Sequence, residues 1–224
     1  MVDELLSDEE REEALREWWQ DNWKWIIGGV VLGVAVLIGW HYWGTYRDQR
    51  AEQASSLYHD VLTAVTAGDA TKAQDSLNKL TADFDSAAYT QQGRLLVAKL
   101  QVEAGKYAEA EALLRAAAEK SKDKELTGIA HLRLARLLIQ QSKYDDAFKL
   151  LEPLTAGGFG AQAREIRGDA LFAKGDTEGA RAEYAAALAN VEAQIDRQMV
   201  ESKLQDVGGV APAAASVRAN GGQP

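Results

Sequence analysis

The side chains that could perform chemistry are few, and they match no catalytic pattern. The sequence contains no cysteine, which excludes thiol catalysis, Cys-based zinc sites and disulfides. Three histidines, His41, His59 and His131, lie far apart, and no His-x-x-x-His pair is present. There is no Gly-x-Ser-x-Gly nucleophile motif and no glycine-rich phosphate loop. We therefore expect no catalytic residues, no metal, no cofactor and no enzymatic activity.

The charge distribution argues against a nucleic-acid partner. Residues 1–24 hold nine acids and three bases, and residues 25–46 hold no Asp, Glu, Lys or Arg. The remaining 178 residues carry 25 acids and 22 bases. A nucleic-acid-binding protein typically shows a basic excess or a basic stripe, and neither is visible here. Carboxylates such as Glu109 and Glu111 are expected on solvated helix faces.

Four similar segments recur in the second part of the chain. Each contains a Gly or Ser followed by polar residues and then by a closing alanine: Ala73, Ala110, Ala147 and Ala180. The closing alanines are spaced 37, 37 and 33 residues apart. Twelve residues before each alanine lies a mostly small residue: Val61, Ala98, Ala135 or Gly168. Four residues after it lies a large apolar or aromatic residue: Leu77, Leu114, Leu151 or Tyr184.

This spacing is typical of helical hairpins. The Gly or Ser ends the first helix, and the alanine packs against the small residue because closely spaced helices leave no room for more. The pattern resembles tetratricopeptide repeats, whose period is about 34 residues. No long stretch alternates with period two, so we predict an all-α fold. It comprises one N-terminal transmembrane helix and a degenerate tetratricopeptide-like solenoid over residues 47–207. We expect about four hairpins and a capping helix at 191–206, whose apolar face carries Val191, Ile195, Met199 and Leu204. The two 37-residue steps predict longer connections between the first three units.

The inner surface of such a solenoid is the predicted binding site, because the first helix of each hairpin lines it. The inward positions are Tyr58, Leu62, Leu95, Lys99, Leu132, Arg136, Glu165 and Asp169, followed on the same faces by Val65, Val102, Ile139 and Phe172. We expect an apolar groove that binds segments of unfolded or partner proteins, with Lys99 and Arg136 holding a carboxylate. The alternative is that these apolar residues pack against the neighbouring hairpin or the capping helix.

The uncharged segment at 25–43 has the properties of a membrane helix. Its 19 residues would span roughly 28 Å as a helix, which is about the thickness of a bilayer core. All six tryptophans lie at or just outside its two ends, as expected for headgroup-level anchors, and His41 is expected to join this aromatic belt. We predict a transmembrane helix at 25–44 that contacts membrane lipid. A buried core helix is the first alternative.

A cleaved signal peptide is the second alternative, but the segment before residue 25 is acidic and bulky rings follow the apolar segment. We predict that residues 1–24 form a short acidic amphipathic leader and that residues 208–224 are disordered. The charges flanking the segment leave its orientation open. Gly29 and Gly33 are four residues apart, a spacing that lets another helix approach closely, although glycine is also common in membrane helices.

Together these features resemble the YfgM family. The resemblance rests on EALREWW at 13–19, GVVLG at 29–33, IGWHYW at 38–43, ASSLY at 54–58 and MVESKLQD at 199–206. Members of this family are single-span proteins of the bacterial inner membrane and ancillary subunits of the SecYEG translocon. The resemblance implies a cytoplasmic N-terminus and a periplasmic repeat domain. It also implies association with the translocon and a periplasmic foldase, and a chaperone-like role toward emerging envelope proteins.

A second hypothesis remains open. A membrane-anchored tetratricopeptide scaffold could organise another cell-envelope complex, in division or outer-membrane assembly, without contacting the translocon. The sequence does not separate the two hypotheses, because a fold does not determine a function.

Overall fold

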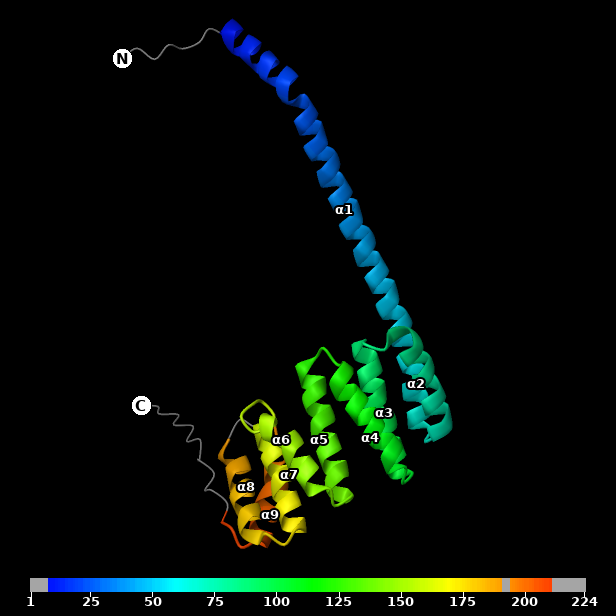
Figure 1. The fold of residues 1–224 in the computed structure, drawn as a ribbon, viewed down its shortest axis with the longest axis vertical. Coiled ribbons are helices and arrows are strands. Elements are labelled where there is room, and N and C mark those ends of the chain that lie inside the picture. The colour runs from blue at the N-terminus through cyan, green and yellow to red at the C-terminus, as the bar shows by residue number, and fades with distance from the viewer. Residues whose placement is uncertain (1–7, 191–193, 211–224) are drawn as a thin grey trace, which may run out of the picture. The chain divides into compact units, whose positions relative to one another are not determined.

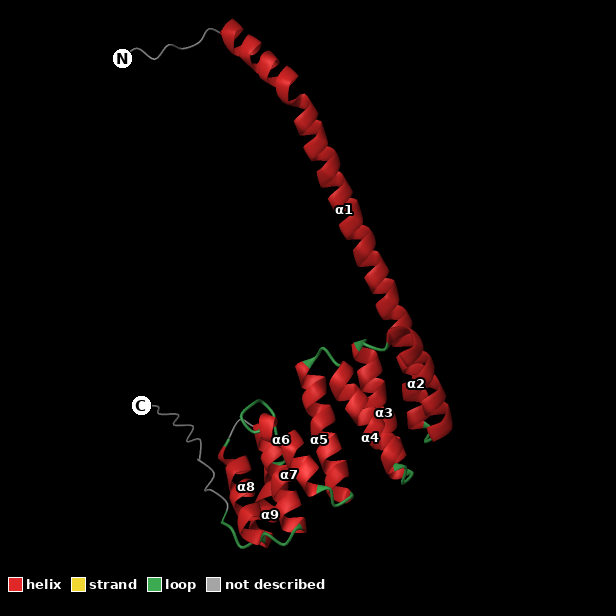
Figure 2. Cartoon of the chain, viewed as in Figure 1, coloured by secondary structure: helices red, strands yellow, loops and turns green. Residues whose placement is uncertain are grey.

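The structure is a computed structural model, and it describes residues 8–190 and 194–210 of the 224-residue chain. All regular structure in these residues is helical, as predicted (Figure 1 and Figure 2). The helices are α1 (Asp8–Thr66), α2 (Ala70–Phe84), α3 (Ala88–Glu103), α4 (Tyr107–Lys120), α5 (Lys124–Gln140), α6 (Tyr144–Leu151), the 3-10 helix η1 (Glu152–Leu154), α7 (Gly160–Ala173), α8 (Thr177–Ala189) and α9 (Arg197–Asp206). The chain divides into two compact units between Gln53 and Ala54.

The first unit contains most of α1, which is one continuous helix through the leader and the apolar segment. The helix is long and apolar enough to cross a membrane, and none of its most apolar window is buried. Trp25 and Trp40, near the two ends of the uncharged segment, are 82% and 81% exposed. A core helix would be mostly buried, so this exposure favours a membrane helix over the core-helix alternative. Residues 1–7 of the leader and the predicted tail from 211 onward lie outside the described residues.

The second unit consists of four helical hairpins and one further helix. The end of α1 and helix α2 share a buried cluster that contains Val61, Ala64, Ala73 and Leu77. The pairs α3–α4, α5–α6 and α7–α8 form the other hairpins, and consecutive hairpins pack against one another. Helix α9 packs on α8. The predicted architecture of about four hairpins and a capping helix is confirmed.

The repeat register predicted from the sequence is also confirmed. Each closing alanine is fully buried at 0% exposure: Ala73, Ala110, Ala147 and Ala180. The small residue at the facing position is needed for close packing, as the fourth hairpin shows. A Cβ added at Gly168 would lie 2.4 Å from the Tyr184 ring, so any larger residue there would force the ring to move.

The hairpin turns depend on a left-handed residue at the end of each first helix. Gly68, Gly105 and Gly175 have φ values of +71°, +73° and +85°, a region that glycine enters without steric cost. Ser142 takes the same place in the third hairpin with φ of 59°. The following residue then bonds back into the helix, as in Lys143 N–H to Leu138 O at 2.8 Å.

The expectation of longer connections between the first three units is wrong. Three residues separate α2 from α3 and three separate α4 from α5, while the longer connection follows α6. The extra residues of the 37-residue steps lengthen the second helices, since α2 and α4 have 15 and 14 residues and α6 has 8. Pro153 stands within the 3-10 turn that follows α6.

The predicted apolar face of the capping helix is only partly correct. Helix α9 begins at Arg197, later than the expected 191, and Ile195 precedes it. Leu204 is buried as predicted and Ile195 packs against the same cluster, but Met199 is 51% exposed, and Val200 and Val207 are buried as well. Asp196 sets this boundary because its side chain accepts a hydrogen bond from Met199 N–H at 3.0 Å and caps the helix. Val191 lies outside the described residues.

Candidate interaction groove

The structure gathers four of the predicted inward-facing residues around one pocket. Leu95, Lys99 and Val102 of α3 and Arg136 of α5 line a pocket of about 430 Å³. The rest of its lining consists of Ala98, Leu114, Arg133, Leu137 and Gln140. The pocket therefore lies where the second hairpin meets the first helix of the third hairpin.

Regular helical spacing positions these side chains. On α3 the lining residues are 95, 98, 99 and 102, and on α5 they are 133, 136, 137 and 140, so each helix contributes one face. Arg133 ties the two helices together, because its Nη1 donates a hydrogen bond to the backbone oxygen of Leu95 at 3.1 Å. Gln140 Nε2 donates to the hydroxyl of Tyr107 at 3.0 Å. The pocket is thus built from two amphipathic faces that a direct hydrogen bond holds in register.

The pocket combines buried apolar residues with exposed cations. Its apolar lining includes Ala98, Leu114 and Leu137, which are 1%, 2% and 3% exposed. Lys99 and Arg136 are exposed at its border. Burial, and then the charge of Arg136, lower the pKa of Arg133 from its ordinary value. An arrangement of this kind can receive an apolar group together with a negative charge.

The other predicted groove residues lie elsewhere in the repeat unit. Tyr58 and Leu62 belong to the first hairpin, where the Tyr58 ring lies 5.5 Å from the Tyr89 ring between centroids. Leu132, 6% exposed, belongs to the main core cluster, against which Ile139 packs. Phe172, 53% exposed, lines a separate pocket of about 190 Å³. The predicted residues therefore do not all surround one cavity.

The fourth hairpin contains a charged cluster that the sequence interpretation did not identify. Lys203 Nζ of α9 lies 2.8 Å from Glu165 Oε1 and 2.9 Å from the Asp169 carboxylate, both on α7. The Tyr184 hydroxyl donates to Asp169 Oδ1 at 2.8 Å. Desolvation by burial, followed by the hydrogen bond to Asp169, raises the pKa of Tyr184. The sequence shows two acids four residues apart on a predicted inward face, but nothing in it identifies Lys203 as their partner.

The histidines show no arrangement suited to chemistry. Burial lowers the pKa of His131, which favours its neutral form. His41 and His59 are exposed. Within the described residues, no three His, Cys, Asp or Glu side chains are grouped so that they could hold a metal ion.

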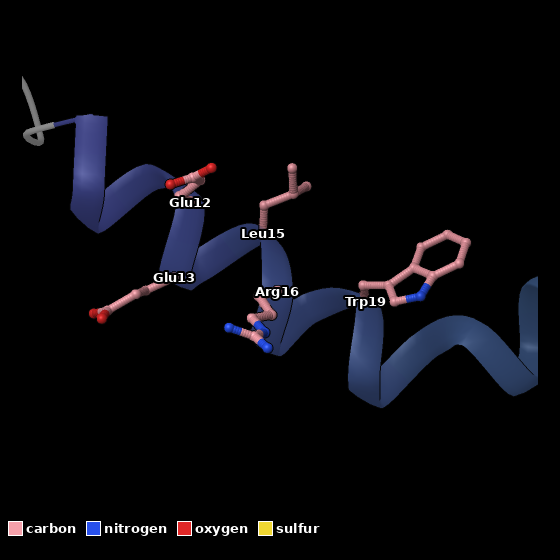
Figure 3. A pocket seen from close by; sticks show the side chains of 5 residues that line it. All are labelled: Glu12, Glu13, Leu15, Arg16 and Trp19. Atoms are coloured by element: carbon pink, nitrogen blue, oxygen red, sulfur yellow. The ribbon is translucent and has the colours of Figure 1, made fainter.

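The described part of the leader forms an open surface and not an enclosed pocket. Glu12, Glu13, Leu15, Arg16 and Trp19 line an open region of α1. All five come from one helix, and Figure 3 shows that their side chains point away from it in different directions. In the apolar segment, a Cβ added at Gly29 or Gly33 would meet no atom within 4 Å. Both glycines therefore have open space beside them in the single chain.

Comparisons with known proteins agree with this architecture. A family model described as a tetratricopeptide repeat-like domain matches residues 16–209. The chain is similar to a protein of Escherichia coli (strain K12) named ancillary SecYEG translocon subunit, with 30% identity over 204 residues that cover 90% of this chain and 97% of the relative. A protein of the same name from Haemophilus influenzae is 30% identical over 202 residues, covering 90% and 98%. One from Neisseria gonorrhoeae is 24% identical over 204 residues, covering 90% and 98%.

Proposed function

The chain belongs to the tetratricopeptide repeat-like family of ancillary SecYEG translocon subunits, and we propose that it is a membrane-anchored interaction protein of the Sec translocon. Alignment over nearly the whole length of the relatives supports this, because both the apolar helix and the repeats are matched. The pocket between α3 and α5 is the observation that carries the interaction role. It offers apolar side chains and cations together, a combination suited to protein segments.

The apolar part of α1 serves as the anchor in the inner membrane. Its exposed apolar side chains contact membrane lipid, and its tryptophans lie at the headgroup level. The N-terminus is cytoplasmic and the repeat unit is periplasmic, an orientation that the family resemblance implies. Gly29 and Gly33 lie on an open helix face and allow close packing of a partner helix.

The repeat unit contacts a periplasmic foldase and emerging envelope proteins in a chaperone-like role. The pocket suits this role because its apolar lining is costly to leave in water and its cations add polar contacts.

The proposal is tested by purification of the full chain from native membranes in mild detergent, with quantitative mass spectrometry of the proteins that accompany it. We expect translocon subunits and a periplasmic foldase to be enriched. Replacement of Gly29 and Gly33 together by Leu should reduce recovery if the anchor helix makes the contact. Reproducible recovery of a division or outer-membrane assembly complex, with no translocon subunit, would contradict the proposal and favour the scaffold alternative.

A further inference from the structure

The repeat unit contains two pockets at equivalent places. Lys99 and Val102 lie eleven and eight residues before the closing alanine Ala110, and Leu114 lies four after it. Asp169, Phe172 and Tyr184 have the same offsets from Ala180, and they line the pocket beside α9. The pocket between α3 and α5 therefore has a structural counterpart between α7 and α9.

The next helix contributes equivalent residues to both pockets. On α5 these are Arg133, Arg136 and Leu137. Their counterparts are Lys203 and Asp206 of α9 and the C-cap residue Val207, with the same spacing. The buried residues agree with this alignment, because Val200 and Leu204 of α9 correspond to Ala130 and Leu134 of α5. Lys203 therefore takes the place of Arg133, and Asp206 takes the place of Arg136.

In the pocket beside α9, the positive charge of Lys203 is neutralised by acidic side chains of the same chain. Lys203 forms ion pairs with the Glu165 and Asp169 carboxylates at 2.8 and 2.9 Å. Asp169 also accepts the hydroxyl hydrogen bond of Tyr184. The acidic side chains of α7 and the basic side chain of α9 thus pair with one another across the pocket.

In the pocket between α3 and α5, the carboxylates are missing. Leu95 and Lys99 stand at the places of Glu165 and Asp169, so Arg133 meets no acid there. Arg133 donates instead to a backbone oxygen, and Lys99 pairs with Glu103 one turn along its own helix at 3.7 Å. Within residues 8–190 and 194–210, no ion pair joins Arg133 or Arg136 to a carboxylate. Three cations converge on an apolar pocket without an opposite charge across it, an arrangement that favours an added anion.

We propose that the pocket between α3 and α5 binds a protein segment in which an Asp or Glu side chain lies beside apolar side chains. The carboxylate binds Lys99, Arg133 and Arg136, as Glu165 and Asp169 bind Lys203, and the apolar side chains fill the buried lining. This inference rests on the proposed interaction role and names the chemistry of the partner. A peptide is favoured over an anionic lipid headgroup because the chain fills the counterpart pocket with protein carboxylates, those of Glu165 and Asp169.

The test uses the full chain in nanodiscs of phosphatidylcholine, which carry no net charge. The probe is a short fluorescent peptide with leucines at helical spacing and two glutamates, and the matched peptide carries glutamine at both places. We expect the glutamate peptide to bind about tenfold more tightly, as charge-assisted hydrogen bonds provide. Its affinity should fall as salt is raised. Equal affinity of the two peptides, or no detectable binding of the glutamate peptide, would overturn the proposal.

Variants assign the binding to the pocket. The double variant Lys99→Gln/Arg136→Gln should lower the affinity for the glutamate peptide about tenfold. Lys79→Gln, at an exposed lysine of α2, should change this affinity less than about twofold. If the double variant binds the peptide with wild-type affinity, the assignment of the binding site to this pocket is wrong. Displacement of the peptide by a short-chain phosphatidylglycerol at lower concentration than by unlabelled peptide would assign the pocket to lipid and overturn the peptide proposal. Peptide binding without recovery of the translocon from membranes would instead contradict the proposed function and leave the pocket assignment standing.

Discussion

Lys203 and Glu165 form an ion pair at 2.8 Å that ties the last helix to the fourth hairpin, and Glu165 is only 8% exposed. Burial lowers the pKa of Lys203, but the hydrogen bonds and charges of Asp169 and Glu165 outweigh it and raise this pKa above its ordinary value. From neutral pH up to pH 10.5 the contribution of the pair to stability is therefore fully present, and it is lost as the pH rises through the higher folded-state pKa of Lys203.

Replacement of Lys203 by Met should weaken the attachment of α9 to the fourth hairpin. The apolar packing volume is kept, but the Glu165 carboxylate loses its partner while remaining nearly buried, at a cost of about 2 kcal/mol. Urea unfolding of the full chain measures the change, and proteolysis at the C-terminal side of α8 reports local release. Gln198→Met on the exposed side of the same helix is the matched control. A Lys203→Met protein as stable as this control would show that the ion pair does not hold the helix.

The closing alanines leave no space for a larger side chain. Ala110 is fully buried between α3 and α4, whereas Ala112, two residues further along, is exposed. Ala110→Leu should lower the free energy of unfolding by about 1–3 kcal/mol because it overpacks the hairpin, and Ala147→Leu should do the same in the third hairpin. Ala112→Leu should leave stability nearly unchanged. Thermal unfolding distinguishes these variants, and equal melting temperatures for Ala110→Leu and Ala112→Leu would be inconsistent with the packing seen here.

The third hairpin has a serine where the others have glycine. Ser142 adopts φ of 59°, a left-handed conformation that costs energy for a residue with a Cβ. Ser142→Gly should therefore stabilise the protein by up to about 1 kcal/mol, reduced by the greater flexibility of glycine in the unfolded chain. Gly175→Ala, at the equivalent turn with φ of +85°, should destabilise it by about 1 kcal/mol. The two changes should move the urea midpoint in opposite directions, and shifts of the same sign would refute this explanation of the turns.

Asp85 should make stability sensitive to acid. Hydrogen bonds from Lys120 and Arg94 lower its pKa below the ordinary value of 3.8, against a smaller opposing effect of burial. Because the folded-state pKa is depressed, this stabilisation is present above pH 3.8 and is lost as the pH falls through the folded-state pKa. Asp85→Asn should be less stable than the wild type at neutral pH, and the difference should shrink below pH 3.8. Asp75→Asn, at an exposed position of α2, controls for charge alone; a difference that stays constant down to pH 2 would contradict this role of Asp85.

The hairpins could be predicted because their packing repeats at fixed offsets in the sequence. Ala110 and its small and large neighbours show the same burial pattern as their counterparts in the other units. The connections could not be predicted from the spacing alone, because extra residues can lengthen a helix as well as a loop. Here they lengthened α2 and α4.

The site was predictable only in part. Leu95, Lys99, Val102 and Arg136 were found because they occupy equivalent positions on first helices. Arg133 was missed because it reaches the pocket from a position outside that inward pattern. Lys203 was missed for a similar reason: its partners lie 34 and 38 residues earlier, and long-range charge pairing leaves no periodic signal in a sequence.

The central claim, that the pocket between α3 and α5 contacts translocon-associated proteins, is tested most directly by photo-crosslinking in native membranes. A photoreactive residue replaces Val102, which lines the pocket, or Lys79, which is exposed on α2. We expect crosslinks from position 102, and not from position 79, to translocon subunits, a periplasmic foldase or newly exported chains. Lys99→Glu with Arg136→Glu should abolish these crosslinks in a protein that still unfolds at the wild-type temperature. The absence of such crosslinks at position 102, or their persistence in the double variant, would contradict the account.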